Sequence, residues 1–536
     1  MSNDCELLSG QLKQRLSLLS EPNHESLLSG IRHGVEKESL RVTPQGQLAL
    51  TPHPASLGST LTHPSITTDF SEALLEFITE PVHSHQATLD TLEQLHRYTY
   101  RQIGDELLWV NSMPCVLGAD EDIPEARYGT SNVGTMKRTY RIGLGHRYGR
   151  LMQTIAGIHY NFSLPDELWQ TLQQADGHSG SLQDYKTEGY LGLIRNFRRN
   201  FWLLMYLFGA SPAVCRSFVR NRPHKLQPVG ADSHSLHSPF GTSLRMGDLG
   251  YQSSAQDSLV VCYNTLDQYI HTLRGALIKP YPEYEGIGLK DANGSYRQLN
   301  THMLQIENEF YSLIRPKRTT HSGEPPVRAL WERGIEYIEV RCLDLNPLLP
   351  VGISVQQMRF IDTFLVMCLL SDSPTTYTAE YYGILENQRR MVYRGRDPEL
   401  TLLRHETEVP VRQWQDELLA AMAPVATLLD NANGGSDYSE ALASYAQLAD
   451  NPDAAPSAQL LDEMRSSGST YFQCSLQHAR QHREYFMDSP MDPAMEEQLQ
   501  QQARDSLAKQ REIEAADEIP FDEFLANYYR GCDFEL

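Results

Sequence analysis

The chain has 536 residues, of which 40% are hydrophobic and 21% are charged, and its formal net charge is −22. This length suits one large catalytic unit or two to three smaller domains, and the composition is ordinary for a soluble globular protein. The acidic balance disfavours nucleic acids and anionic membranes as partners, because it repels phosphate groups.

The opening residues, the short apolar runs and the cysteines favour an intracellular protein. The opening "MSNDCELLSGQLKQ" is polar and does not resemble a signal peptide, and the most apolar runs fall short of the ~20 residues that span a bilayer. Eight cysteines are scattered without a C-x-x-C pair, which favours buried thiols in a reducing compartment. We therefore expect a cytoplasmic protein that does not bind membranes.

The first predicted elements are a helix over 5–29 and a strand over 32–42, "RHGVEKESLRV". On a strand, Glu36 and Glu38 point to the same face, since side chains alternate. Two neighbouring like charges are unfavourable without a positive partner. That partner can be solvent, an arginine or a metal ion, and the strand alone does not decide among them.

The next segment, 67–80 or "TTDFSEALLEFITE", predicts a helix, because its apolar residues recur at helical spacing. Asp69 stands three residues before Glu72, as in a capping box, so an N-cap role is the simplest interpretation of Asp69. Glu76, two turns further on, would be an ordinary surface residue or would face the same cation as Asp69.

Three later segments alternate like strands and collect polar side chains on one face. In 155–165 this face holds His159 and Asn161; in 334–347 it holds Glu339 and Arg341. In 303–318 it holds Gln305, Glu307, Glu309 and Tyr311. Taken singly, each face is best explained as solvent-exposed. Taken together, these oxygen and imidazole donors favour a divalent cation.

From about residue 354 the pattern is mainly helical, with helices predicted over 354–373, ending before Pro374, and over 496–518. Strands and helices mix without regular βαβ alternation, which indicates an α+β fold with a mainly antiparallel sheet. We expect a single catalytic unit over 1–536, with the sheet core and active site in 30–347 and a helical C-terminal part in 350–536. No glycine-rich phosphate loop is present, so a nucleotide would be held by metal ions and basic side chains.

Several motifs in order resemble the proteobacterial type of glutamate–cysteine ligase. They are "GVEKESLRV", "ITTDFSEALLEFIT", "YGTSN", "QTIAGIHYNFSLP", "LFGASPA", "TSLRMGDLGY", "LQIENEFYSLIRPKR" and "RGIEYIEVRCLDLNP". The resemblance implies a glutamine-synthetase-like curved antiparallel sheet that forms a funnel flanked by helices. It also implies ATP-dependent ligation of the γ-carboxylate of L-glutamate to the amine of L-cysteine through a γ-glutamyl phosphate, with Mg²⁺, or Mn²⁺ in its place. A monomer is expected.

The resemblance also implies roles for individual residues. The implied metal ligands are Glu36, Glu38, Asp69, Glu76, His159 and Glu339, with Gln305 as a weaker candidate. Arg341 would hold the acyl phosphate, and Arg245 would grip a substrate carboxylate. The cysteine side of the site would comprise Tyr140, Arg141, Leu144, Gln153, Tyr251 and Tyr311. The nucleotide would contact Asn161, a weaker metal-ligand candidate, together with Lys317 and Arg318.

Three alternatives stay open at this point. A related carboxylate–amine ligase would use another amine acceptor. A divalent-metal hydrolase would activate water and need no ATP. A non-catalytic acidic scaffold would leave its polar strand faces in solvent and gain no stability from Mg²⁺ with nucleotide.

Overall fold

A computed structural model describes residues 9–114, 117–219, 222–229, 234–250, 256–321 and 323–534. Within these ranges one antiparallel sheet of seven strands lies at the centre, in the order β2-β3-β1-β5-β10-β9, with β4 paired to the end of β1. Its strands are β1 Arg32–Val42, β2 Ile66–Thr68, β3 Leu74–Ile78, β4 Leu107–Leu108, β5 Ile158–Ser163, β9 Ile314–Lys317 and β10 Tyr337–Leu343. The α+β class and the antiparallel sheet are therefore confirmed.

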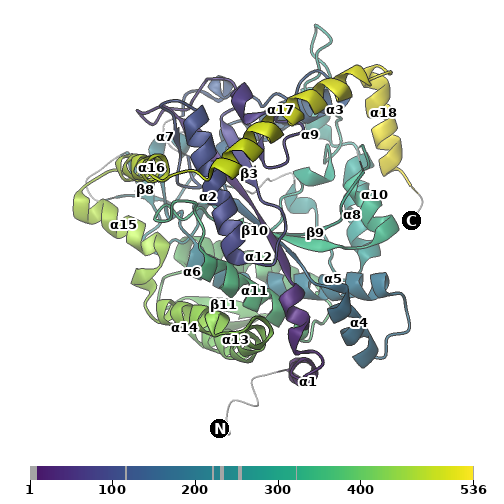
Figure 1. The fold of residues 1–536 in the computed structure, drawn as a ribbon, viewed down its shortest axis with the longest axis vertical. Helices are drawn as coiled ribbons and strands as arrows, with labels where there is room; N and C mark the ends of the chain where they lie inside the picture. The colour runs from purple at the N-terminus through teal and green to yellow at the C-terminus, as the bar shows by residue number, and fades with distance from the viewer. Residues whose placement is uncertain are drawn as a thin grey trace.

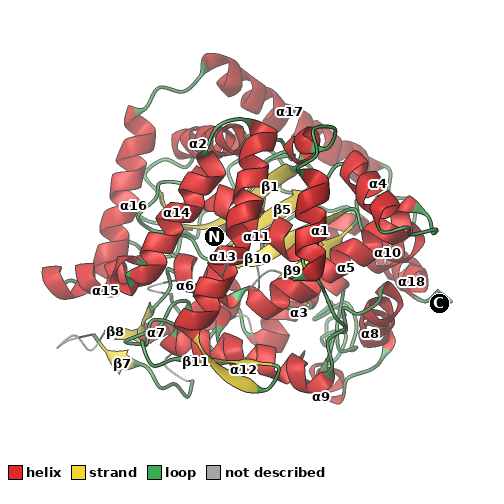
Figure 2. Ribbon diagram, turned by 90° about the horizontal axis from the view of Figure 1, so that it is seen from below, coloured by secondary structure: helices red, strands yellow, loops and turns green. Residues whose placement is uncertain are grey.

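Helices cover the sheet and make up most of the rest of the described chain (Figure 1). Seen from below, α1, α11, α13 and α14 lie over the strands β1, β5 and β10 (Figure 2). The helices are α1 Gly10–Leu19, α2 His85–Gln102, α3 Asn132–Tyr148, α4 Asp166–Ala175, α5 Leu182–Asn200, α6 Trp202–Phe208, α7 Arg216–Val219, α8 Leu266–Ile278, α9 Pro282–Ile287, α10 Pro326–Arg333, α11 Val355–Leu370, α12 Thr378–Arg394, α13 Val411–Asn433, α14 Asp437–Asp450, α15 Pro456–Ser467, α16 Tyr471–Asp488, α17 Pro493–Ala515 and α18 Phe521–Cys532.

The long strand β1 has two differently used faces. His33 and Lys37 point toward the helices, where the Lys37 ammonium lies 2.7 Å from Nε2 of His96 on α2. Glu36 and Glu38 point to the opposite face, as the alternation predicts. Lys37 therefore does not lie between the two carboxylates, and burial lowers its pKa to about 7.

The predicted helix over 67–80 is wrong. This segment forms β2, a turn and β3, and β3 pairs with β1. Leu74, Leu75 and Phe77 are fully buried in the hairpin. Their spacing fits a helical stripe as well as a strand buried on both faces, and pairing with β1 decides between the two. Asp69 consequently lies in the turn and is not a helix N-cap.

The predicted strand over 303–318 is also mostly wrong. Only Ile314–Lys317 joins the sheet, as β9, while Glu307–Glu309 forms a short 3-10 turn. Glu309 forms an ion pair of 2.9 Å with Arg147 of α3, and Glu307 accepts a hydrogen bond from the Val327 amide. These acids hold loops and helices in place and do not face the sheet site.

The C-terminal part is helical, as predicted, except for the hairpin of β11 Thr401–Arg404 and β12 Thr407–Pro410. A separate three-stranded sheet consists of β6 Ala213–Cys215, β8 Ser235–His237 and β7 Gln227–Pro228. The chain's last helices return to the front of the molecule, where α17 and α18 lie near α3 and α10 (Figure 1). There the Tyr529 hydroxyl donates to the Gln305 carbonyl at 2.9 Å. The division into a sheet core and a helical part of one catalytic unit stays a prediction.

The helix predicted over 5–29 begins at Gly10 within the described residues and ends at Leu19, followed by a 3-10 turn over Glu25–Gly30. Cys342, Cys368, Cys474 and Cys532 are buried thiols, as expected, whereas Cys215 is disulfide-bonded. Within the described ranges no helix has both the length and the apolarity needed to cross a membrane.

The buried helix α11 provides a test of the core. Leu365 is fully buried on α11, whereas Leu385 on α12 is 38% exposed. We expect Leu365→Ala to lower the free energy of unfolding by about 2–5 kcal/mol, because it leaves a cavity in a packed core. The matched control Leu385→Ala should change it by less than about 0.5 kcal/mol. Denaturant unfolding followed by circular dichroism measures both; equal losses in the two variants would contradict the assignment of α11 to the core.

Candidate active site

The register of the sheet gathers acidic side chains on the face opposite the helices α2 and α11. Glu36 of β1 pairs with His159 of β5, and Glu38 pairs with Glu76 of β3. Further along the sheet, Asn161 of β5 pairs with Glu339 of β10. Cross-strand partners lie on the same face. The alternation noted separately in the segments that form β1, β5 and β10 thus describes one continuous polar surface.

His159 lies at the centre of this surface. Its Nδ1 is 3.1 Å from Glu36 Oε2 and 3.8 Å from Glu339 Oε1, and its Nε2 is 3.8 Å from Glu38 Oε1. The other Glu36 oxygen accepts a hydrogen bond of 2.9 Å from Asn161. One potential ligand atom from each of Glu36, Glu76 and His159 lies within 4.8 Å of the others. This spacing suits groups that share a cation.

The electrostatics divide the surface into two halves. Burial, followed by the charge of Asp69, raises the pKa of Glu38 to about 8. Burial, followed by the charge of Glu36, raises the pKa of Glu76 well above its ordinary value. This half of the site holds more negative charge than its own side chains balance, which is the condition that a bound cation relieves.

Basic side chains supply positive charge at the other half. The Arg341 guanidinium lies 3.1 Å from Glu339 Oε2, and the Lys317 ammonium lies 3.6 Å from Glu339 Oε1. Burial raises the pKa of Glu339, but Lys317 and Arg341 outweigh it and hold this pKa well below its ordinary value. Burial and the charge of Arg341 lower the pKa of His159, so a ring nitrogen of His159 is available as a ligand.

Asp69 reaches this region from the turn between β2 and β3. Its carbonyl oxygen accepts hydrogen bonds from the Tyr128 hydroxyl, at 2.9 Å, and from the Arg141 guanidinium of α3. The charge of Asp69 is, after burial, the next cause of the raised pKa of Glu38, and Glu76 pairs with Glu38. The turn and β3 thus bring Asp69 and Glu76 to the other acids through a hairpin and not through a helix.

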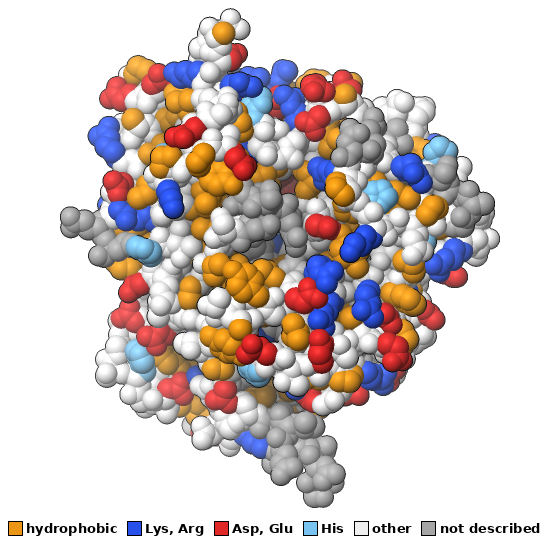
Figure 3. Space-filling view, turned by 180° about the vertical axis from the view of Figure 1, so that it is seen from behind, with side chains coloured by type: hydrophobic (Ala, Val, Ile, Leu, Met, Phe, Trp, Pro, Cys, Tyr) orange, Lys and Arg blue, Asp and Glu red, His pale blue; other side chains and the backbone are white. Residues whose placement is uncertain are grey.

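Two cavities adjoin the Glu339 and Arg341 end of the sheet. One, of about 480 Å³, is lined by Arg245, Arg341 and Tyr311 together with Tyr263 and Tyr381. The other, of about 350 Å³, is lined by Lys317 and Arg318 among others. The face of the molecule seen in Figure 3 is hollowed near its centre, with acidic and basic side chains gathered beside the hollow.

Arg245 is almost fully buried, and its guanidinium donates to the Arg341 carbonyl at 2.8 Å. It thus lines the first cavity and also supports the backbone of β10. Arg318 lies 3.8 Å from Glu336, a longer and more exposed contact.

The residues predicted for the cysteine side are only partly gathered. Tyr140, Arg141 and Leu144 lie on α3, and the Gln153 amide donates to the Tyr311 hydroxyl at 3.0 Å. Tyr251 lies outside the described residues. The weaker candidate Gln305 is fully buried, where its side chain accepts from the Leu299 amide and donates to the Tyr140 carbonyl. Both ends of the Gln305 side chain are thus engaged, so the suggestion of Gln305 as a metal ligand is wrong.

Sequence reasoning missed Gly157, which precedes β5. Its amide donates to Glu38 Oε2 at 2.6 Å and fixes that carboxylate. A Cβ at this position would collide with the Arg245 guanidinium, so the close approach requires glycine. The feature of the sequence that could have identified Gly157 was its position directly before a polar strand.

Comparisons with known proteins agree with this geometry. A family model described as glutamate–cysteine ligase matches residues 16–391. The glutamate–cysteine ligase of Alcanivorax borkumensis is 53% identical over 522 residues, covering 97% of this chain and 99% of that protein. The enzyme of the same name from Pseudomonas aeruginosa is 50% identical over 521 residues, covering 97% and 98%.

Solved structures are similar as well. The crystal structure of glutamate–cysteine ligase from Francisella tularensis, in complex with AMP, matches with a TM-score of 0.88 and 37% identity, covering 94% of this chain and 99% of that one. A bifunctional glutathione synthetase from Pasteurella multocida shares the fold, with a TM-score of 0.68 and 24% identity over 89% of this chain and 55% of that one.

The raised pKa of Glu38 predicts how pH affects the protein stripped of divalent cations. Between about 4.5 and about 8 the folded state keeps a proton that the unfolded state has released. The unfolded state then binds fewer protons, so stability falls as pH rises through this range and levels off above it. We expect the melting temperature of EDTA-treated protein to follow this course in scanning calorimetry.

Glu38→Gln should flatten this fall, because a neutral amide carries no charge to desolvate. Glu80→Gln, an exposed position just beyond β3, serves as the matched control and should keep the parent slope. Parallel curves for the parent and Glu38→Gln would contradict the prediction.

Proposed function

The chain belongs to the glutamate–cysteine ligase family, and we propose from this membership how its sheet carries the reaction. The enzyme uses ATP to join the γ-carboxylate of L-glutamate to the amine of L-cysteine, which is the first step of glutathione synthesis. The observation that carries this assignment is the 53% identity over nearly the whole chain. The family resemblance drawn from the sequence motifs is thereby confirmed.

The polar face of the sheet has the donor set that Mg²⁺ requires. Glu36, Glu38, Glu76 and Glu339 offer carboxylate oxygens, and Asp69 lies close enough to raise the pKa of Glu38. Two buried atoms, His159 Nε2 and Asn161 Oδ1, have no hydrogen-bond partner among the described residues. Cations would satisfy these atoms and balance the acids. When bound, Mg²⁺ screens the repulsion between ATP and the glutamate carboxylate and stabilises the transferring phosphoryl group.

Arg341 is the residue that we assign to the phosphoryl group. It stands at the boundary between the acidic half of the surface and the first cavity, with its side chain partly exposed and close to both Glu339 and His159. A guanidinium there can donate two parallel hydrogen bonds to an acyl phosphate as charge develops. Arg245 donates a hydrogen bond to the Arg341 carbonyl and lines the same cavity. Its guanidinium can bind a substrate carboxylate there.

The two cavities offer separate places for L-glutamate and the nucleotide, and Arg341 lines the first of them. We assign L-glutamate to the cavity lined by Arg245 and Tyr311, because it combines guanidinium groups with a volume suited to an amino acid. L-Cysteine would enter beside Gln153, Tyr311 and α3, where Tyr140, Arg141 and Leu144 lie. The relative from Francisella tularensis binds AMP, and we assign the nucleotide of this chain to the cavity lined by Lys317 and Arg318, with Asn161 nearby.

The acceptor amine is tested directly by its product. Incubation with glutamate, ATP and Mg²⁺ and a panel of amino acids, followed by mass spectrometry, should yield γ-glutamylcysteine from cysteine alone at substantial rate. Faster product formation with another amine would identify a related ligase, and turnover without ATP would identify a hydrolase. The monomeric state, the cytoplasmic location and the choice of Mg²⁺ over Mn²⁺ stay predictions.

Glu36→Gln tests the metal role of the surface. We expect the rate of γ-glutamylcysteine formation to fall about 100-fold or more, because a carboxylate ligand at the phosphates is lost. The melting temperature without Mg²⁺ should fall only slightly. Burial opposes the charge of Glu36, but the hydrogen bond with His159 outweighs burial and holds the Glu36 pKa below its ordinary value, while glutamine can still accept from Asn161. Glu80→Gln should keep parent activity; activity within about two-fold of the parent in Glu36→Gln would reject the metal role.

Arg341→Lys tests the phosphoryl role. Lysine keeps the charge but loses the planar pair of donors, so kcat should fall about 10- to 100-fold with a smaller change in the KM for glutamate. Arg138→Lys, on the exposed side of α3, is the matched control. An unchanged kcat, measured by coupled ADP release, would remove Arg341 from the proposed mechanism.

A further inference from the structure

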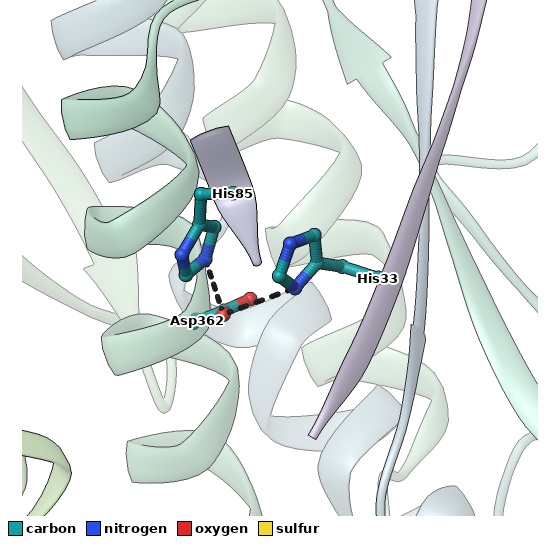
Figure 4. A group of neighbouring side chains, drawn as sticks. All are labelled: His33, His85 and Asp362. Carbon is teal, nitrogen blue, oxygen red and sulfur yellow. Dashed lines mark hydrogen bonds and ion pairs between the residues drawn. The ribbon is translucent and has the colours of Figure 1, made fainter. Parts of the chain in front are cut away.

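A buried hydrogen-bond network lies behind the sheet, on the face of β1 and β5 turned away from the polar surface. Asp362 of α11 accepts a hydrogen bond of 2.7 Å from the Tyr160 hydroxyl of β5 at Oδ1, and one of 2.8 Å from His85 Nε2 of α2 at Oδ2. His33 of β1 lies beside them, with its Nδ1 3.8 Å from Asp362 Oδ2 (Figure 4). The network thus joins two neighbouring strands to the helices behind them.

The network places a carboxylate in an apolar core. Asp362 is 0% exposed, and it is the one charged residue in the segment of α11 from Phe360 to Leu370. Burying a carboxylate is costly, and a well-packed apolar residue in its place is often as stable or more so. What Asp362 adds is therefore direction, because its two oxygens select which donors from β5 and α2 meet it.

Ring contacts extend the network across the strands. The His33 ring lies nearly parallel to the His85 ring, with centroids 4.0 Å apart, and to the Tyr160 ring, with centroids 5.9 Å apart. Burial lowers the pKa of His33 to about 4, so near neutral pH this ring is uncharged and packs as an aromatic surface. Hydrogen bonds from Tyr160 and His85, and not a charge on His33, consequently hold the Asp362 carboxylate.

Tyr160 stands between two residues of the polar surface. Its chain neighbours His159 and Asn161 point to the opposite face of β5, and both contact Glu36, at 3.1 and 2.9 Å. A slip or rotation of β5 moves its two faces together. Fixing the Tyr160 hydroxyl on one face therefore fixes where its neighbours meet Glu36 on the other.

We propose that Asp362, acting through Tyr160, positions the cation ligands of β1 and β5 from behind the sheet. This inference rests on the proposed function, because it takes the polar face to bind cations. Both are positioning residues, since Asp362 acts on Tyr160 and Tyr160 acts on the backbone of β5. Groups that orient metal ligands typically contribute about 10- to 100-fold to metal affinity.

The test measures Mn²⁺ affinity and not activity. Mn²⁺ is titrated into the full chain without nucleotide, and free Mn²⁺ is followed by electron paramagnetic resonance at about 0.15 M KCl, which screens weak binding to the acidic surface. We expect Tyr160→Phe, which removes the hydroxyl and keeps the ring, to raise the Kd of the tightest site about 10-fold. Asp362→Leu, which removes the acceptor for both donors, should raise it at least as much.

Tyr98→Phe is the matched control. The Tyr98 side chain on α2 is 1% exposed, and its hydroxyl donates a hydrogen bond of 2.8 Å to the Ser56 carbonyl, outside the network. Tyr98→Phe and Tyr160→Phe should lower the melting temperature by similar amounts, because each loses one such hydrogen bond. Only Tyr160→Phe should weaken Mn²⁺ binding, which separates positioning of the ligands from a general loss of stability.

Glu36→Gln locates the measured ion. Weaker Mn²⁺ binding in this variant assigns the tightest site to the polar face, whereas parent affinity there, or no Mn²⁺ bound by the parent, would reject the metal role and this inference with it. A Kd within about two-fold of the parent in Tyr160→Phe and Asp362→Leu, both shown to be folded by far-UV circular dichroism, would overturn the positioning role alone. An equal rise of the Kd in Tyr98→Phe would also overturn it.

Discussion

The mutual repulsion of acids held on one sheet face is the constraint on which this structure depends. Glu36 and Glu38 come from β1, Glu76 from β3 and Glu339 from β10, and they surround His159 of β5, which lies between β1 and β10. The sheet cannot spread them apart, because antiparallel pairing fixes the spacing of cross-strand neighbours. The protein balances Glu339 with Lys317 and Arg341 but leaves the β1–β3 half with an excess of negative charge. A ligase that must bring two anionic substrates together can use that excess to hold cations.

Strand β1 shows how one element serves two tasks. Its outward face presents Glu36 and Glu38 to the site, and its inward face buries His33, Val35 and Lys37 against α2 and α11. The rigidity of the inward face positions the outward carboxylates, since a one-residue slip would move every side chain to the wrong face. The precise placement of ligands therefore depends on packing behind the sheet as much as on the ligands themselves.

Alternation along single strands was enough to predict part of the site. Side chains two residues apart on a strand point to the same face. This rule alone places together Glu36 with Glu38, His159 with Asn161, and Glu339 with Arg341. Asp69 and Glu76 were assigned to a helix because their apolar neighbours fit both periods, and only the pairing of β3 with β1 distinguishes the two. The segment around Glu307 alternates as well, yet it is drawn out of the sheet by the ion pair of Glu309 with Arg147. Gly157 and Arg245 meet across distant parts of the chain, a contact that no local pattern encodes.

The central claim is that cations bind the polar face of this sheet. The most direct measurement is a crystal structure of the full chain grown with Mn²⁺ and ADP, with anomalous scattering recorded to locate manganese. The account predicts anomalous peaks about 2.0–2.4 Å from carboxylate oxygens of Glu36 and Glu38, between the sheet and the nucleotide phosphates. ADP bound with no manganese peak next to either glutamate would contradict it.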